Sequence, residues 1–129
     1  MTNTDLEIKV IERFVVKTKR DRYLTFIKNT KTRDKFLKEL SHFKDLRQDL
    51  FEELKSDERK KIKEKLNRSR NIKDCYLISE NSKLDSNRLD IETALNEIIG
   101  HGMGTLIVFG DAEIVYYEGE GPSDRYISK

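Results

Sequence analysis

Two apolar runs separated by a short turn sequence constrain the fold of this chain more than any other feature. Residues 105–109 and 112–117 are rich in β-branched, aliphatic and aromatic side chains, a composition that favours strands. Gly110 and Asp111 lie between the two runs. A Gly followed by Asp suits a two-residue type II′ turn, because Gly accepts a positive φ at the first position. The sequence therefore predicts a β-hairpin.

Alternation along this hairpin assigns its side chains to two faces. Leu106 and Val108 share one face, and Ile107 and Phe109 share the other. Because both faces of the first strand are apolar, we expect both to be covered. The second strand has Glu113 near its start and two tyrosines at its end, which predicts partial exposure. A hairpin alone is marginally stable, so further elements must pack on it.

Residues 1–70 contain neither glycine nor proline, and their apolar residues recur at helical spacing. Thr4 and Glu7 have the spacing of a capping box, and Ser56 suits the cap of a last, basic helix. Residues 17–22 are expected to form a kink. Helices are predicted at about residues 5–17, 23–28, 32–43 and 57–67, with residues 46–54 either extending the third or forming another.

The second half of the chain predicts a strand at 74–80, a polar loop, and an amphipathic helix at 89–99. Asp90 suits the N-cap of this helix and Gly100 its C-terminal end. Strand, helix and hairpin strand then make a βαβ unit, whose right-handed crossover would leave its two strands parallel. Residues 125–128 are either a short edge strand or disordered.

The expected fold class is α/β or α+β within a single domain, 1–129. Residues 1–70 form an N-terminal helical layer, and residues 71–129 form the sheet-forming half, a small mixed sheet built from a βαβ unit and a hairpin. No membrane-spanning run and no signal peptide are recognisable. The single cysteine, Cys75, cannot form an internal disulfide, so a cytoplasmic location is expected.

Charge is unevenly distributed along the chain. Residues 1–70 carry 21 Lys and Arg against 13 Asp and Glu, whereas residues 71–129 carry 5 against 11. One interpretation is a basic surface for RNA or DNA. The other, which we favour, is a basic half that packs beside an acidic half in one fold. The candidate nucleic-acid contacts are Lys17, Lys19, Arg20, Arg22, Tyr23, Lys31 and Arg33.

The loops 100–103 and 118–125 are expected to meet at one end of the hairpin, because its strands are antiparallel. They carry the candidate pocket residues His101, Tyr117, Glu118, Glu120, Arg125 and Tyr126. A histidine with two carboxylates can hold a divalent metal, but the spacing matches no established ligand pattern, and a polar rim is favoured. The glycines of residues 100–104 follow a helix rather than precede one, which favours a helix end over a phosphate-binding loop.

Three segments of the sequence, residues 22–27, 36–46 and 117–126, resemble a family of small stand-alone bacterial proteins that has no assigned activity. This resemblance covers most of the chain and transfers no catalytic residue. The element order over residues 75–109 is also similar to the closing part of the C-terminal domain of release-factor-like proteins. The glutamine-bearing loop of release factors is missing, so peptide release is not implied.

The sequence favours a non-catalytic interaction domain that binds a protein partner or a second copy of itself, with no cofactor and no metal. Its basis is the exposed strand edge that a short sheet must present and the missing catalytic motifs. One alternative is an RNA- or DNA-binding module that uses the basic face 17–35. A second is a small metal-dependent hydrolase at His101, Glu118 and Glu120.

Overall fold

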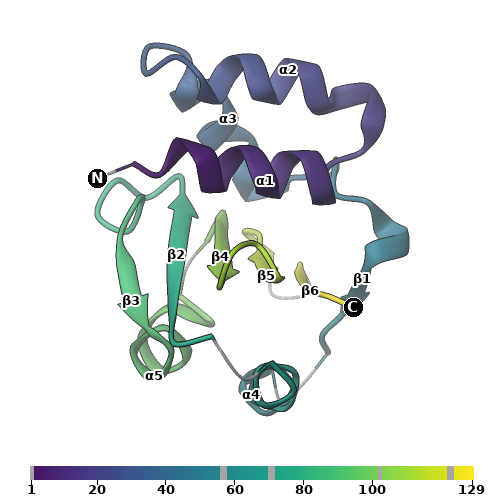
Figure 1. Cartoon of the computed structure of the whole chain (residues 1–129), viewed down its shortest axis with the longest axis vertical. Helices are drawn as coiled ribbons and strands as arrows, with labels where there is room; N and C mark the ends of the chain where they lie inside the picture. Colours follow the sequence, from purple (N-terminus) through teal and green to yellow (C-terminus); the bar gives the residue numbers. More distant parts are fainter. Residues whose placement is uncertain (1, 56–57, 70–71, 102, 122–123) are drawn as a thin grey trace.

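The computed structural model describes residues 2–55, 58–69, 72–101, 103–121 and 124–129. In these residues, helices cover both faces of a six-stranded antiparallel sheet, so the fold is α+β (Figure 1). The order of the strands across the sheet is β1-β6-β5-β4-β2-β3. The strands are β1 (Phe51–Glu53), β2 (Asp74–Ser79), β3 (Arg88–Asp90), β4 (Thr105–Phe109), β5 (Ile114–Glu118) and β6 (Arg125–Ser128).

The predicted hairpin is confirmed as β4 and β5, but its turn differs from the prediction. Phe109 pairs with Ile114, so four residues connect the strands instead of two. Gly110 has the positive φ expected of it, +65°, and Ala112 has a φ of +60°. Ala112 leaves the strand because it is buried in the core and its carbonyl accepts a hydrogen bond from Arg13 Nη1 at 2.7 Å. The expected exposure of β5 is also wrong, because its residues from Val115 onward are buried.

The predicted parallel pair of β2 and β4 is wrong, although the two strands are neighbours. Leu77 of β2 lies opposite Ile107 of β4 in an antiparallel ladder, so the sheet is not mixed. The strand β3 was not predicted; it returns alongside β2 after a loop in which Ser86 has a φ of +65°. Because β3 and β4 are both antiparallel to β2, they are parallel to each other across it. The helical crossover therefore starts from β3 and not from β2.

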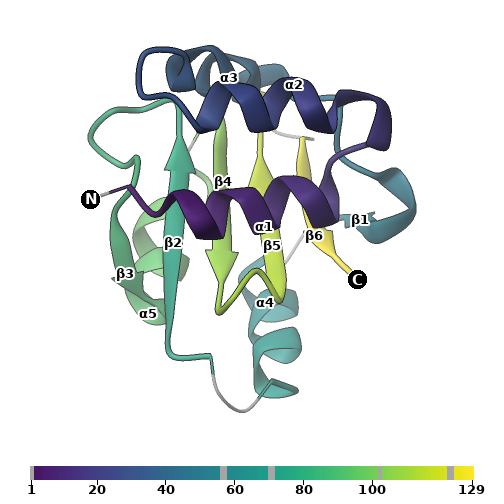
Figure 2. The same ribbon diagram turned by 45° about the horizontal axis from the view of Figure 1, so that its top comes forward.

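Three helices cover one face of the sheet: α1 (Thr4–Phe14), α2 (Lys17–Ile27) and α3 (Arg33–Glu39). Figure 2 shows α1 crossing in front of the strands, with α2 and α3 above it. Their apolar residues pack on Leu106, Val108 and Tyr117, which confirms the expected cover. The predicted kink at residues 17–22 is wrong, since this segment forms the first turns of α2. The cap of α1 is Asn3, whose Oδ1 accepts the Leu6 N–H at 3.1 Å.

The opposite face is covered by α4 (Glu58–Asn67) and by α5 (Ile91–Thr93), which continues as a π-helical segment, Ala94–Ile98. These helices bury a second apolar cluster that contains Ile62, Leu95 and Ile107. Asp90 caps α5 as predicted, and Gly100 has a φ of +90°. The cap predicted at Ser56 and the helix start at Asp57 lie outside the described residues.

The division into a helical layer, 1–70, and a sheet-forming half, 71–129, does not hold. Residues 46–54 are not helical but form a 3-10 turn, Gln48–Leu50, followed by β1, and α4 packs on the face opposite to α1. The reason lies in Phe51 and Leu54, which bury their side chains on opposite faces of the sheet. The strand β6 lies between β5 and β1 and is not an edge. No helix of the described segments is long and apolar enough to cross a membrane.

Candidate functional site

The helix end at Gly100 and the end of β5 meet, as the antiparallel hairpin predicts. The Gly100 N–H donates to Glu118 Oε1 at 2.7 Å. The same oxygen accepts the Tyr116 hydroxyl at 2.8 Å and lies 3.6 Å from Arg125 Nε. The side chain of Glu118 is buried. Its carboxylate therefore joins the loop after α5 to β5 and β6, which is a structural role. Gly102, in the same glycine loop, lies outside the described residues.

The sheet separates the candidate pocket residues into two groups. Glu118 and Arg125 lie opposite each other on the face of α4 and α5. Tyr117 and Tyr126 belong to the other face, where their rings stack with centroids 6.5 Å apart. His101 is exposed, and its backbone N–H ends the preceding helix by donating to Ile98 C=O at 2.9 Å. The structure thus forms two pairs from the predicted group.

The side chain of Glu120 contacts that of His42, a residue whose aromatic and basic neighbours in the sequence favour a packing role. His42 Nε2 lies 2.7 Å from Glu120 Oε2, and both side chains are more than half exposed. The Glu120 N–H also donates to Ser41 C=O at 2.9 Å. The two side chains are far apart in the sequence and leave no local signal, because only the packing of the 3-10 turn Leu40–His42 against the end of β5 joins them.

A pocket of about 230 Å³ opens beside this pair. It is lined by His42, Phe43, Lys44, Gln48, Tyr117, Asp124 and Tyr126. The hydroxyl of Tyr117 donates to Leu40 C=O and accepts the Phe43 N–H at 3.0 Å. Burial raises the pKa of Tyr117 to about 12, so this phenol stays protonated near neutral pH and acts as a structural bridge.

The described residues contain no cluster of three or more His, Cys, Asp or Glu side chains placed to bind a metal. Cys75 is fully buried in β2, and burial raises the pKa of its thiol to about 12. A nucleophilic cysteine requires an exposed, easily ionised thiol. The environment of Cys75 is that of a small apolar core residue.

Two of the seven candidate nucleic-acid contacts are core residues. Tyr23 is buried, and its hydroxyl donates to Asp45. Arg33 is buried between Glu7 and Asp85, with Nη atoms 2.6 and 2.5 Å from their carboxylate oxygens. The other five candidates, on or beside α2, are exposed or half-buried. These five are Lys17, Lys19, Arg20, Arg22 and Lys31.

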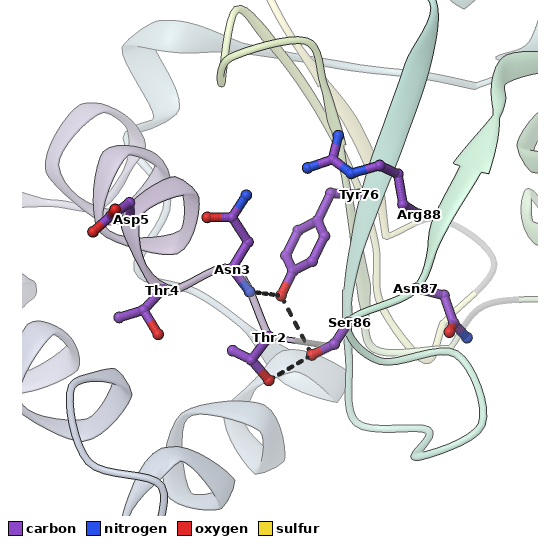
Figure 3. A pocket seen from close by; sticks show the side chains of 8 residues that line it. All are labelled: Thr2, Asn3, Thr4, Asp5, Tyr76, Ser86, Asn87 and Arg88. Carbon is purple, nitrogen blue, oxygen red and sulfur yellow. Dashed lines mark hydrogen bonds between the residues drawn. The ribbon is translucent and has the colours of Figure 1, made fainter.

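A larger pocket, of about 670 Å³, lies where α1 begins beside β2 and β3. Figure 3 shows the Tyr76 hydroxyl between Asn3 and Ser86, which also line this pocket. That hydroxyl accepts the Asn3 N–H at 3.0 Å and donates to Glu7 Oε2 at 2.6 Å. Arg88 lies over the Tyr76 ring, 5.8 Å from its centroid. The Tyr76 and Ser86 hydroxyls and the Asn3 N–H already bond one another, and the pocket is also lined by Thr4, Asp5 and Asn87.

The two edge strands of the sheet, β1 and β3, have three residues each and carry different side chains. At one end β1 carries the exposed side chains Glu52 and Glu53. At the other end β3 carries Arg88 and Asp90, both exposed, on either side of the half-buried Leu89. The strand β3 escapes prediction because Leu89 fits the apolar periodicity of the following helix. Asp90 is the N-cap of α5 and has an extended backbone, with φ of −72° and ψ of 161°. A predicted N-cap is therefore a position at which a preceding strand can end.

Comparison of the chain with protein-family models, with curated proteins and with solved structures found no match.

Proposed function

We propose that this chain is a non-catalytic interaction domain that associates with a second copy of itself through the edge strand β3. The observation that carries the proposal is the exposure of this edge: Arg88 and Asp90 are exposed and Leu89 is half-buried. An uncovered strand edge presents backbone N–H and C=O groups that another strand can pair with.

Apolar side chains beside the β3 edge support the proposal. Three apolar side chains pack against the second core cluster, the one covered by α4 and α5, but remain partly exposed: Leu84, Leu89 and Ile91. A second copy that pairs with β3 would bring its own three residues against these. Burial of apolar area would then add to the backbone hydrogen bonds.

The candidate catalytic carboxylates already bond other groups of the protein, which also favours a binding function over a catalytic one. Glu118 is bonded to Gly100 and Tyr116, and Glu120 is paired with His42. A general acid or base needs to reach a proton on the substrate. A carboxylate whose buried oxygen already accepts two hydrogen bonds is better suited to holding the loop after α5 against β5.

Sedimentation equilibrium over a wide concentration range tests the proposal. We expect a reversible monomer–dimer equilibrium that Leu89→Lys shifts toward monomer, because the substitution places a charge in the apolar contact. Glu53→Lys, at the opposite edge, is the matched control and should leave the equilibrium unchanged. Thermal unfolding checks that both variants fold. A monomeric wild-type chain at every concentration would remove the proposal.

A second candidate function, binding to RNA or DNA, is favoured by the surface of α2. Within the described part of the chain, none of its cations Lys17, Lys19 and Arg22 lies within 4 Å of a carboxylate; Lys17 and Arg22 are exposed and Lys19 is half-buried. Such cations are available to phosphates. Arg20 is a weaker candidate, because its Nε donates to Val15 C=O at 3.0 Å.

Fluorescence anisotropy with a labelled single-stranded oligonucleotide tests this second function. The affinity should fall steeply as salt rises, and Lys17→Glu with Arg22→Glu should weaken binding to all sequences about equally. Lys60→Glu on α4, an exposed lysine on the opposite side of the sheet, is the matched control. Affinity that is insensitive to salt would rule this function out.

A further inference from the structure

The hydrogen bonds between β2 and the residues just before β3 show which backbone groups of β3 face away from the sheet. The Leu77 N–H donates to Asn87 C=O at 2.9 Å, and Leu77 C=O accepts the Ser86 N–H at 2.8 Å. Bonded and non-bonded pairs alternate along an antiparallel ladder. Cys75 and Leu89, which are Cα partners, therefore form the next bonded pair. The N–H groups of Arg88 and Asp90 point outward.

We propose that two copies of this chain pair β3 with β3 in antiparallel orientation, about a twofold axis that passes beside Leu89. This inference rests on the self-association proposed above and specifies its register. In this register Arg88 lies opposite Asp90 of the partner subunit, and the symmetry repeats the pair. The Asp90 N–H then donates to the carbonyl of Arg88 of the partner subunit. The six-stranded sheet continues across the axis into a second copy.

Charge complementarity selects this register. The strand carries a cation, an apolar residue and an anion in order, so reversing its direction about Leu89 places opposite charges face to face. Opposite charges at directly opposed positions stabilise an antiparallel pair, and like charges destabilise it. A shift of the axis to Arg88 would place Arg88 against itself. The sequence of β3 therefore matches its own reverse in one alignment only.

The opposite sheet edge, β1, is not complementary in charge to a second copy of itself. An antiparallel pairing of β1 with itself about Glu52 would place two Glu52 carboxylates in direct opposition, which is destabilising. Pairing β1 with β3 of another copy would leave one edge of each type open and continue into a filament. Pairing β3 with β3 uses the same edge of both copies and closes at a dimer.

The existing bonds of Arg88 and Asp90 are compatible with the interface. Arg88 bonds Asp74 Oδ1 at 3.2 Å through Nη1, with both side chains about half exposed. Asp90 Oδ1 accepts the Thr93 N–H at 2.7 Å. A guanidinium carries five donors and a carboxylate about four acceptor sites, so the intermolecular pair adds to these bonds. Figure 3 shows the Arg88 side chain reaching from β3 toward the Tyr76 ring.

Cross-linking tests the register. Arg88→Cys and Asp90→Cys proteins are mixed and treated with a bifunctional methanethiosulfonate that has a short spacer. We expect a linked heterodimer, identified by its mass, to form several-fold faster in the mixture than either homodimer. The native thiol of Cys75 is buried, with its pKa raised to about 12, so it contributes little background. Wild-type protein treated in the same way serves as the blank.

A charge exchange supplies the second measurement. Arg88→Asp and Asp90→Arg should each weaken the dimer, and the double variant should restore it. Because the arginine introduced at position 90 lies opposite Asp74 in the β2–β3 register, it can form an ion pair within one chain. An equimolar mixture of the two single variants is therefore measured beside the double variant, since its heterodimer regains both opposite-charge pairs while each chain keeps its own defect. Thermal unfolding confirms that all three variants fold.

The outcomes separate this register from the self-association on which it rests. A chain that stays monomeric by sedimentation overturns both. A dimer that shows neither preferential cross-linking of positions 88 and 90 nor rescue by the double exchange overturns the β3 register alone. Preferential cross-linking together with rescue confirms the register.

Discussion

Glu7 of α1 and Arg33 of α3 form a two-bonded ion pair that is almost fully excluded from solvent. Arg33 Nε donates to Glu7 Oε1 at 3.0 Å, and Nη2 donates to Oε2 at 2.6 Å. The exposed fractions of the two side chains are 0% for Glu7 and 10% for Arg33. Arg33 also bonds Asp85 in the loop before β3. One guanidinium therefore connects two helices to the sheet.

Replacing Glu7 with Gln should destabilise the fold by about 3–5 kcal/mol, because it leaves a buried guanidinium short of one countercharge. Burial acts to lower the pKa of Arg33, but its bonds to Glu7 and Asp85 outweigh burial and raise it, so Arg33 stays charged. Urea unfolding measures the loss. Glu12→Gln, on the exposed side of α1, is the control and should change stability by less than about 0.5 kcal/mol. Equal effects of both variants would contradict the proposed role of the pair.

The Tyr117 hydroxyl should contribute to stability as a bridge between backbone groups. Tyr117→Phe leaves Leu40 C=O and the Phe43 N–H without their partner in a buried site, at an expected cost of about 1–3 kcal/mol. Tyr126→Phe is the matched control, since this neighbouring ring is only half-buried. Chemical unfolding of both variants checks the prediction. A smaller loss for Tyr117→Phe than for Tyr126→Phe would exclude the bridge.

The fold should lose stability in alkaline solution, starting above pH 9. Burial raises the pKa of Cys75 from 9.0 to about 12 and that of Tyr117 from 10.0 to about 12. Between those values the unfolded chain has released protons that the folded chain still holds, so a rise in pH favours unfolding. Each group contributes at most about 1.4 kcal/mol per pH unit.

Urea midpoints measured at several values between about pH 8 and pH 11 test this dependence. Cys75→Ala should remove the part of the decline that begins near the ordinary thiol pKa of 9.0, while the part that begins near the ordinary phenol pKa of 10.0 should remain. An unchanged profile in this variant would show that the thiol does not titrate differently in the two states.

The elements that could be predicted are those whose patterns depend on local residues. The hairpin of β4 and β5, the strand β2 and the cap at Asp90 follow from composition and spacing, and all are observed. The meeting of Gly100 with the end of β5 follows from antiparallel pairing. What failed was the direction of β2 relative to β4, because three residues, Arg88–Asp90, form a strand too short to leave a periodic signal.

Long-range partners explain the remaining differences. Glu7 has the spacing of a capping residue, but its carboxylate is taken by Arg33, 26 positions away. Arg33 resembles one more cation of a basic face until its two carboxylate partners are known. His42 and Glu120 meet only because β5 ends beside a 3-10 turn. Local pattern carries no information about such pairs, since tertiary packing alone brings them together.

Substitution of Glu118 distinguishes a structural role from the metal-dependent hydrolase that the sequence analysis gave as an alternative. Its buried carboxylate accepts hydrogen bonds from Gly100 and Tyr116, so Glu118→Gln should cost about 1.5–3 kcal/mol. Glu120→Gln is the matched control: its pairing with His42 is more than half exposed and should be worth less than about 1 kcal/mol. Thermal unfolding with Zn²⁺, Mn²⁺ or EDTA should give the same Tm shifts for wild type and both variants. A wild-type Tm that rises with one of these ions, and no longer rises in Glu118→Gln, would instead support a metal at this carboxylate.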